Sequence, residues 1–103
     1  MSVLSLSERV LNVIDELEPG DTLEAKVTRL AESELRRRLA RYQLIDRQFQ
    51  AKYGMTLEEF EARGIIKEMN YNFEVESDHQ DWDLAVDGIR STERQIADLL
   101  DES

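Results

Sequence analysis

The stretch from residue 22 to residue 53 contains neither proline nor glycine, and it constrains the fold more than any other part of the chain. It is rich in Leu, Ala, Glu, Arg and Gln, which are good helix formers. Asp21 and Glu24 form a capping-box pattern at its start, and Gly54 can adopt the left-handed conformation that ends a helix. A single helix over these residues would extend roughly 48 Å. We therefore expect the rest of this 103-residue chain to be arranged around one long central helix.

The apolar residues of this helix lie on more than one side of it. From Leu23 to Leu39 they recur every four residues, and each step advances about 40° around the helix, so the stripe winds. A helix that is apolar on several sides needs several neighbours, and in a short chain these can include a second copy. We predict a homo-oligomer, a dimer or higher, with a coiled-coil-like interface. Its predicted residues are Leu30, Leu35, Leu39, Leu44 and Phe49.

Asp46 lies close to this stripe and has two interpretations. A polar residue within a helical seam can fix register or partner choice at some cost in stability. Alternatively, Asp46 lies at the solvated edge of the seam, where most carboxylates are found.

Shorter helices are predicted on both sides of the central one. Residues 5–18 form an amphipathic helix that begins with a capping box at Ser5, and the Pro19-Gly20 turn favours antiparallel packing on the long helix. Thr56 and Glu59 form another capping box, which starts a short helix over 57–63. The last helix covers 78–101 after a cap at Ser77, and Gly88 weakens it by up to about 1 kcal/mol relative to Ala.

Residues 71–76 change the period of the pattern. Tyr71, Phe73 and Val75 alternate with polar residues, which is the period of a strand with one apolar face. Because no other segment reads as a strand, three interpretations stay open: an extended linker lying on the helices, pairing with a second copy, or addition to the sheet of another protein.

Together these patterns predict an all-α protein with a single helical domain over residues 1–103. A long central helix has antiparallel flanking helices, as in a helical hairpin or bundle, and one short extended segment lies near 71–76.

The net charge of −10 is concentrated in the C-terminal half. Residues 1–56 hold nine acids and nine bases, whereas residues 57–103 hold fourteen acids and four bases. Nucleic acid and anionic membranes would repel such a surface, and a small basic protein would be attracted to it. The alternative is that the acids only maintain solubility. The absence of Cys, of an apparent signal peptide and of a long apolar segment predicts a cytoplasmic protein without membrane association.

Catalysis and metal binding are not predicted. One His, no Cys and no Gly-rich phosphate loop exclude the common nucleophile and phosphate-binding arrangements. The acids around His79 lack the glycine and bidentate glutamate spacing of a Ca²⁺ loop, and helix capping explains them better. The Arg36-Arg37-Arg38 triplet points in three directions around a helix, which favours solvation or pairing with acids over nucleic-acid binding. We therefore expect no enzyme and no cofactor.

A resemblance to other proteins bears on the function of this chain. Lys52-Tyr53-Gly54-Met55-Thr56, Glu58-Glu59-Phe60, Phe73-Glu74-Val75-Glu76-Ser77-Asp78 and Trp82 resemble a set of small helical bacterial and archaeal proteins. The resemblance covers roughly residues 35–100. Some of those proteins are proposed antitoxin-like partners of a neighbouring small protein, so the resemblance implies an interaction role.

The function expected from the sequence is a non-enzymatic, antitoxin-like interaction module that binds a basic partner through its acidic C-terminal half. The predicted partner-binding residues are Tyr71, Phe73, Val75, Glu76, Asp78, Asp81 and Trp82. The alternative is a structural, scaffold-type helical homo-oligomer that has no toxin partner.

Overall fold

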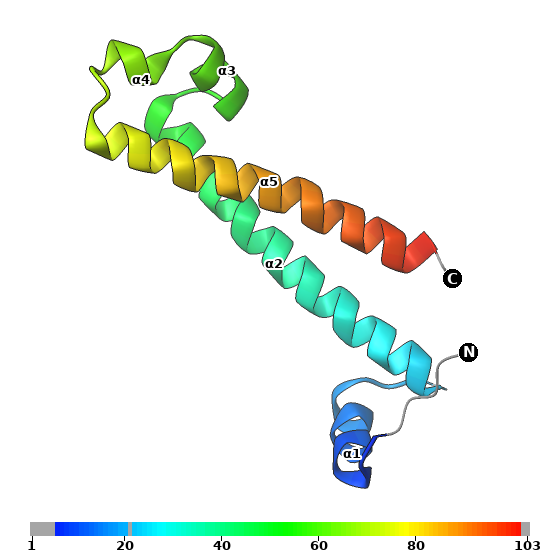
Figure 1. Ribbon diagram of the computed structural model, residues 1–103. Helices are drawn as coiled ribbons and strands as arrows, with labels where there is room; N and C mark the ends of the chain where they lie inside the picture. Colours follow the sequence, from blue (N-terminus) through cyan, green and yellow to red (C-terminus); the bar gives the residue numbers. More distant parts are fainter. Residues whose placement is uncertain (1–5, 21, 102–103) are drawn as a thin grey trace. The chain divides into compact units, whose positions relative to one another are not determined.

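The computed structural model describes residues 6–20 and 22–101 and places five α-helices there (Figure 1). These are α1 (Glu8–Leu17), α2 (Leu23–Tyr53), α3 (Leu57–Ala62), α4 (Ile65–Glu68) and α5 (Phe73–Asp101). No strand occurs in these ranges, so the all-α prediction is confirmed. The chain divides into two compact units, residues 1–34 and 35–103. Because α2 passes from one unit into the other without a break, the single domain over 1–103 stays a prediction.

The first unit contains α1 and the beginning of α2. The Ser7 hydroxyl caps α1 by accepting a hydrogen bond from the backbone N–H of Val10 at 3.2 Å. Lys26 of α2 forms an ion pair with Asp15 of α1. The predicted capping residue Ser5 lies outside the described residues. Along α1, Ile14 is buried while Val13 and Leu17 are exposed.

The central helix has the predicted boundaries to within one residue. The Thr22 hydroxyl accepts a hydrogen bond from the N–H of Ala25 at 3.1 Å, while Asp21 lies outside the described residues. At the other end Gly54 has a φ of 68°, and its N–H donates to the Gln50 carbonyl at 2.7 Å. This left-handed residue ends the helix, as its position predicts.

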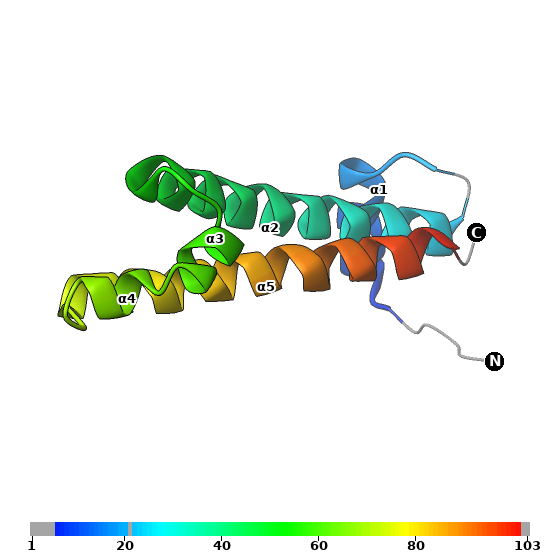
Figure 2. The same ribbon diagram turned by 90° about the horizontal axis from the view of Figure 1, so that it is seen from above.

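Two short helices reverse the chain direction between α2 and α5. Thr56 and Glu59 form the predicted capping box, with each side chain bonded to the backbone N–H of the other residue. Gly64 follows α3 with a φ of 64°, and Ile65 then anchors α4 in the core. As a result α5 runs back antiparallel beside the part of α2 that begins at Leu35 (Figures 1 and 2). The predicted hairpin of long helices is therefore confirmed.

The expected extended segment near 71–76 is wrong. Residues 73–76 form the first turn of α5, which begins five residues before the predicted start at 78. The helix begins there because the Asn72 side chain accepts a hydrogen bond from the Glu74 N–H at 2.8 Å. The Asn72 carbonyl accepts another from the Glu76 N–H at 3.0 Å. The alternation of apolar residues was a coincidence of composition, since only Val75 of the three is buried.

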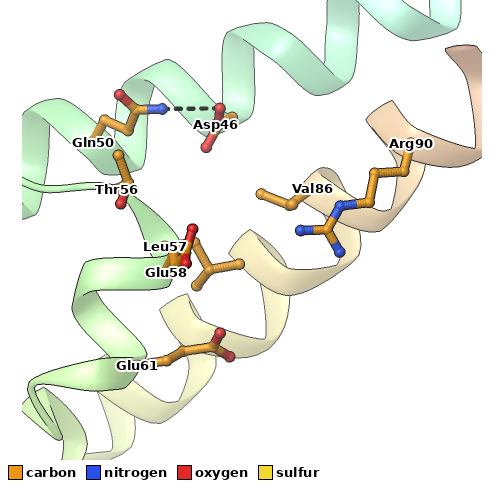
Figure 3. Close-up of a pocket in the computed structure, with 8 residues that line it drawn as sticks. All are labelled: Asp46, Gln50, Thr56, Leu57, Glu58, Glu61, Val86 and Arg90. Atoms are coloured by element: carbon orange, nitrogen blue, oxygen red, sulfur yellow. Dashed lines mark hydrogen bonds between the residues drawn. The ribbon is translucent and has the colours of Figure 1, made fainter.

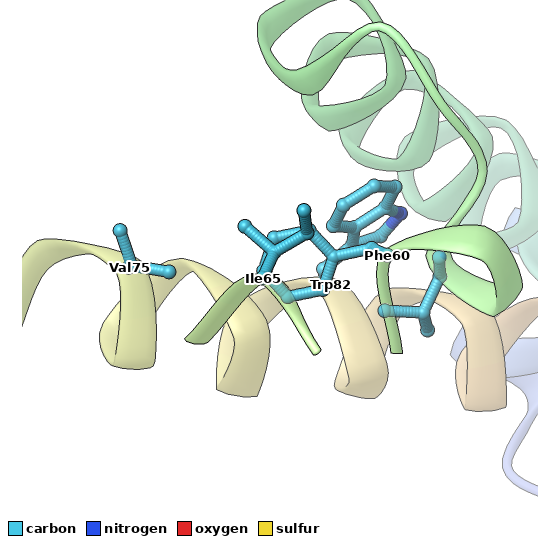
Figure 4. Packing of buried hydrophobic residues seen from close by; sticks show 5 residues of the cluster. Phe60, Ile65, Val75 and Trp82 are labelled. Atoms are coloured by element: carbon cyan, nitrogen blue, oxygen red, sulfur yellow. The ribbon is translucent and has the colours of Figure 1, made fainter. Parts of the chain in front are cut away.

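The core of the second unit is built mainly from α3, α4 and α5. Its buried residues are Leu57, Phe60, Ile65, Val75 and Trp82, of which Phe60 and Trp82 are the most completely buried (Figure 4). By contrast α2 contains no fully buried residue and contributes partly buried side chains such as Phe49 and Tyr53. The central helix therefore forms one side of the core, and the centre of the core lies on α5.

Four aromatic rings meet at the centre of this core. The Trp82 ring lies 5.6 Å from the Phe49 ring, 5.7 Å from the Tyr53 ring and 5.3 Å from the Phe60 ring, measured between centroids. Its indole N–H donates to the Asp46 carboxylate at 2.8 Å, and Gln50 donates to the other carboxylate oxygen of Asp46 at 3.0 Å. Asp46 thus accepts the hydrogen bond of a buried tryptophan from the edge of the core.

Gly88 marks a close crossing of α5 over α2. A Cβ atom added at this position would lie 2.7 Å from two ring carbons of Tyr42 and 2.8 Å from its Cγ. Because Cγ is next to the helix backbone, the ring cannot swing away freely. The glycine is therefore required by packing, and the cost expected from its low helix propensity is offset by close contact between the helices.

We predict that Gly88→Ala destabilises the protein although alanine is the better helix former. Overpacking typically costs ~1–3 kcal/mol, and the gain in helix propensity is at most about 1 kcal/mol. The melting temperature, followed by circular dichroism, should fall by roughly 4–8 °C per kcal/mol lost. In a Tyr42→Ala background the same Gly88→Ala change should raise the melting temperature, and a rise in the wild-type background would contradict the close crossing.

We also predict that Asp46→Ala lowers the free energy of unfolding by roughly 1–3 kcal/mol, because it leaves the buried Trp82 N–H without an acceptor. Trp82 is the only tryptophan, so urea unfolding can be followed by its emission. Asp46→Asn keeps an acceptor for the Trp82 N–H, so its free energy of unfolding should fall by less. Asp83→Ala removes an exposed carboxylate from a helix and serves as the matched control. Equal losses at positions 46 and 83 would argue against the indole contact.

Candidate functional site

The turn between α4 and α5 exposes three large side chains, Met69, Tyr71 and Phe73, which we call the aromatic corner. Their exposed fractions are 49%, 61% and 84%. Exposed apolar residues are common singly, whereas a group of them close together is typical of protein–protein contacts, and these three lie within five residues of one another.

The backbone of the aromatic corner is fixed by a defined helix-ending motif. The Tyr71 N–H donates to the Ile66 carbonyl at 2.9 Å, and the Asn70 N–H donates to the Lys67 carbonyl at 3.1 Å. This is the Schellman pattern, in which Asn70 has the left-handed conformation with a φ of 55°. Tyr71 also has a positive φ, 54°, a conformation that costs a non-glycine residue about 1–2 kcal/mol.

The strained backbone places the Tyr71 ring in solvent. Asn72 then caps α5, so Phe73 occupies the first position of that helix and points away from the core. Tyr71 and Phe73 are thus presented by two consecutive hydrogen-bonded motifs. A partner would meet them with little further loss of backbone freedom, which favours binding.

A charged network joins the start of α5 to the end of α2. The Lys52 ammonium donates to Glu74 at 3.0 Å and to Asp78 at 2.6 Å, and the Tyr53 hydroxyl donates to the same Asp78 oxygen. The Tyr53 ring also stacks on Trp82 and meets Phe60 edge-on at 5.0 Å. The aromatic core is therefore connected directly to the helix that carries Phe73.

This network shifts three pKa values. Hydrogen bonds to Asp78 and Glu74 raise the pKa of Lys52 above its ordinary value. Burial, together with the hydrogen bond to Asp78, raises the pKa of Tyr53 to about 12. Burial acts to raise the pKa of Asp78, but the hydrogen bonds from Lys52 and Tyr53 outweigh it, so the pKa of this carboxyl is lowered.

The charge around the aromatic corner is negative. Residues 68–83 include six acids and no Lys or Arg. Two of the acids, Glu74 and Asp78, are engaged by Lys52. Glu68, Glu76, Asp81 and Asp83 are exposed on α4 and α5. The corner therefore combines exposed aromatic rings with an excess of negative charge.

The structure separates the predicted partner-binding residues into three groups. Tyr71, Phe73, Glu76 and Asp81 are exposed. Asp78 is largely enclosed by Lys52 and Tyr53. Val75 and Trp82 are 3% and 0% exposed, so assigning them to a partner surface is corrected: they are core residues, because α3 and α4 cover this side of α5 (Figure 4).

The predicted oligomer-interface residues also differ in exposure. Leu44 is 48% exposed, whereas Leu30, Leu35 and Leu39 are partly buried. Phe49 is stacked on Trp82. Leu44 is therefore the most accessible of the five.

A small cleft lies between α2, α3 and α5, with a volume of about 260 Å³ (Figure 3). Its charged and polar lining consists of Asp46, Gln50, Thr56, Glu58, Glu61 and Arg90. Asp46 is already bonded to Trp82 and Gln50. Glu61 is hydrogen-bonded to His79 Nε2 at 2.8 Å, and the His79 ring stacks on Phe60 with the ring centroids 5.8 Å apart. The cleft therefore has few groups left to orient a ligand.

Within the described ranges, no group of three His, Asp or Glu side chains is placed to hold a metal ion. Instead, His79 is hydrogen-bonded to Glu61, and its ring stacks on Phe60. No helix in the described part of the chain has the length and apolarity needed to cross a bilayer. Comparisons with protein-family models, curated proteins and solved structures give no match for this chain.

Sequence reasoning missed Met69, Lys52 and the two asparagines of the aromatic corner. The Asn70-Tyr71-Asn72 triplet carried a usable signal, because asparagine favours both the left-handed end of one helix and the cap of the next. Lys52 carried none, since its partners are 22 and 26 residues away in the sequence.

The network predicts a pH dependence of stability. The lowered pKa of Asp78 means that its contribution is present above its ordinary pKa of 3.8 and is lost as the pH falls through the lower folded value. The free-energy difference between wild type and Asp78→Asn, from urea unfolding, should therefore be constant near neutral pH and shrink below about pH 4. The raised pKa of Tyr53 predicts a second loss of stability, as the pH rises from the ordinary Tyr pKa of 10.0 to about 12.

Asp83→Asn, which removes an exposed carboxylate from the same helix, is the control. Its difference from wild type should stay small throughout the titration. A gap for Asp78→Asn that widens below pH 4 would contradict the assigned direction.

Proposed function

We propose that this chain is a non-enzymatic, antitoxin-like interaction module that binds a small basic protein at the aromatic corner. The observation that carries the proposal is the exposure of Phe73 and Tyr71, at 84% and 61%, on a hydrogen-bonded turn surrounded by acids. Aromatic residues dominate the binding energy of many interfaces, and opposite charge speeds the encounter.

The chemistry of the corner favours a partner rich in Lys and Arg. The rings of Tyr71 and Phe73 offer faces to a guanidinium or ammonium group, and Glu68 and Glu76 supply charge around them. A basic surface of this kind is typical of proteins that act on nucleic acid. An acidic module that covers it would compete with the nucleic acid, which is how an antitoxin-like protein would inhibit a ribonuclease-like toxin.

The proposal is tested with Tyr71→Ser/Phe73→Ser, which should leave the fold intact because both side chains lie in solvent. Tagged wild type should recover one small basic protein from the native host at fixed stoichiometry, and the double variant should lose it. The complex formed from the purified pair should weaken as salt rises, because opposite charges contribute to it.

Leu17→Ser is the matched control, since Leu17 is 61% exposed, like Tyr71, but belongs to α1 and to neither proposed surface. The melting temperatures of all variants should agree with that of wild type. A basic partner that stays bound to the double variant, or recovery of nothing but further copies of the chain, would refute the proposed function.

A further inference from the structure

A second surface lies along the seam between α2 and α5, and it differs from the aromatic corner. A groove of about 400 Å³ is lined by Tyr42, Ile45, Gln48, Phe49, Asp81, Leu84 and Ala85. Leu84, which lines this groove, is 67% exposed. We propose that the groove and its exposed leucine, here called the seam face, form a two-fold interface with a second copy of the chain.

The seam face is the side of the hairpin that α3 does not cover. Around α5, successive residues are separated by 100°, so Leu84 lies 160° from Trp82. Trp82 faces Phe60 of α3, whereas Leu84 lines the groove. Tyr42, Ile45 and Phe49 remain only partly buried on the α2 side. Two α-helices with a covering layer on one side form half of a four-helix bundle, and a second hairpin completes such a bundle.

The shape of the seam face is self-complementary. It carries a projecting leucine, Leu84, directly beside a hollow whose apolar lining includes Ile45, Phe49 and Ala85. In a two-fold dimer the same patch meets itself, so each copy supplies one projection and one hollow. Leu84 of each copy can therefore enter the groove of the other.

The charges of the two helices select a second copy as the occupant. Arg41 of α2 is next to the groove residue Tyr42, whereas α5 carries Asp81, which lines the groove, and Asp87. A two-fold axis parallel to the helices lays α2 of one copy over α5 of the other. Opposite charges then face each other twice, and no other protein is needed to supply either sign.

The contacts within the hairpin indicate which charges come together. Tyr42 packs on Gly88, and Phe49 stacks on Trp82, so residue 41 of α2 lies level with residues 87–88 of α5. The parallel axis preserves these levels between copies. Arg41 of one copy is thereby placed beside Asp87 of the other. Both side chains are exposed in the single chain, where Asp87 has only a long ion pair with Arg90, at 3.8 Å.

Sedimentation equilibrium of the full chain at micromolar concentration tests the proposal. Wild type should show twice the mass of one chain. Leu84→Glu should shift the chain to single mass, because it places charge in the interface. Met69→Glu is the matched control: Met69 is 49% exposed but belongs to the aromatic corner, so this variant should keep the double mass.

Charge exchange tests the arrangement of the two copies. Arg41→Asp and Asp87→Arg should each raise the dissociation constant several-fold, and both changes in one chain should restore it. Single mass for wild type, a mass above two chains, or loss of dimer in Met69→Glu would overturn the proposal. Because capture of a basic protein is measured separately with Tyr71→Ser/Phe73→Ser, failure of either proposal is distinguishable from failure of the other.

Discussion

The indole ring of Trp82 is the contact on which the second unit depends. It is fully buried, lies between rings contributed by α2 and α3, and donates its N–H to Asp46. Fixing this ring fixes the Tyr53 ring stacked on it, and the Tyr53 hydroxyl in turn reaches Asp78 on α5. The same aspartate accepts from Lys52. The first turns of α5, and with them the position of Phe73, are therefore held through a chain of contacts that begins in the core.

Helix ends that are determined by residues close to them in the sequence were predictable. Gly54 and the Thr56–Glu59 capping box act within four residues of the positions they determine, so the residue types alone indicate them. The start of α5 was not predicted, because alternation over 71–76 resembles a strand and equally fits a turn followed by a helix. Burial of Val75 decides between these structures, and that burial comes from α3 and α4, which no local pattern encodes.

The candidate site was predictable only in part, for a related reason. The sequence predicts Tyr71 and Phe73 as exposed partner-binding residues with acids around them, and of this prediction the exposure of both side chains is confirmed. It could not separate them from Val75 and Trp82, because an apolar residue has the same identity whether it faces the core or solvent. Nor could it place Lys52 beside Glu74 and Asp78, since that contact depends on how α2 and α5 pack. Asn70 and Asn72, by contrast, did carry a signal in the sequence, because asparagine favours the conformations that form this turn.

The acids of α4 and α5 fall into groups with different surroundings. Lys52 pairs with both Glu74 and Asp78 and offsets one of their two negative charges, so these two acids stabilise the hairpin and add less to the external field. Glu68 and Glu76 stay exposed beside the aromatic corner, where a basic partner would meet them. Asp87, further along α5, lies level with the α2 arginine that a second copy would present. Because the two proposed surfaces use different acids, binding at one leaves the charge at the other in place, and a dimer would carry two aromatic corners.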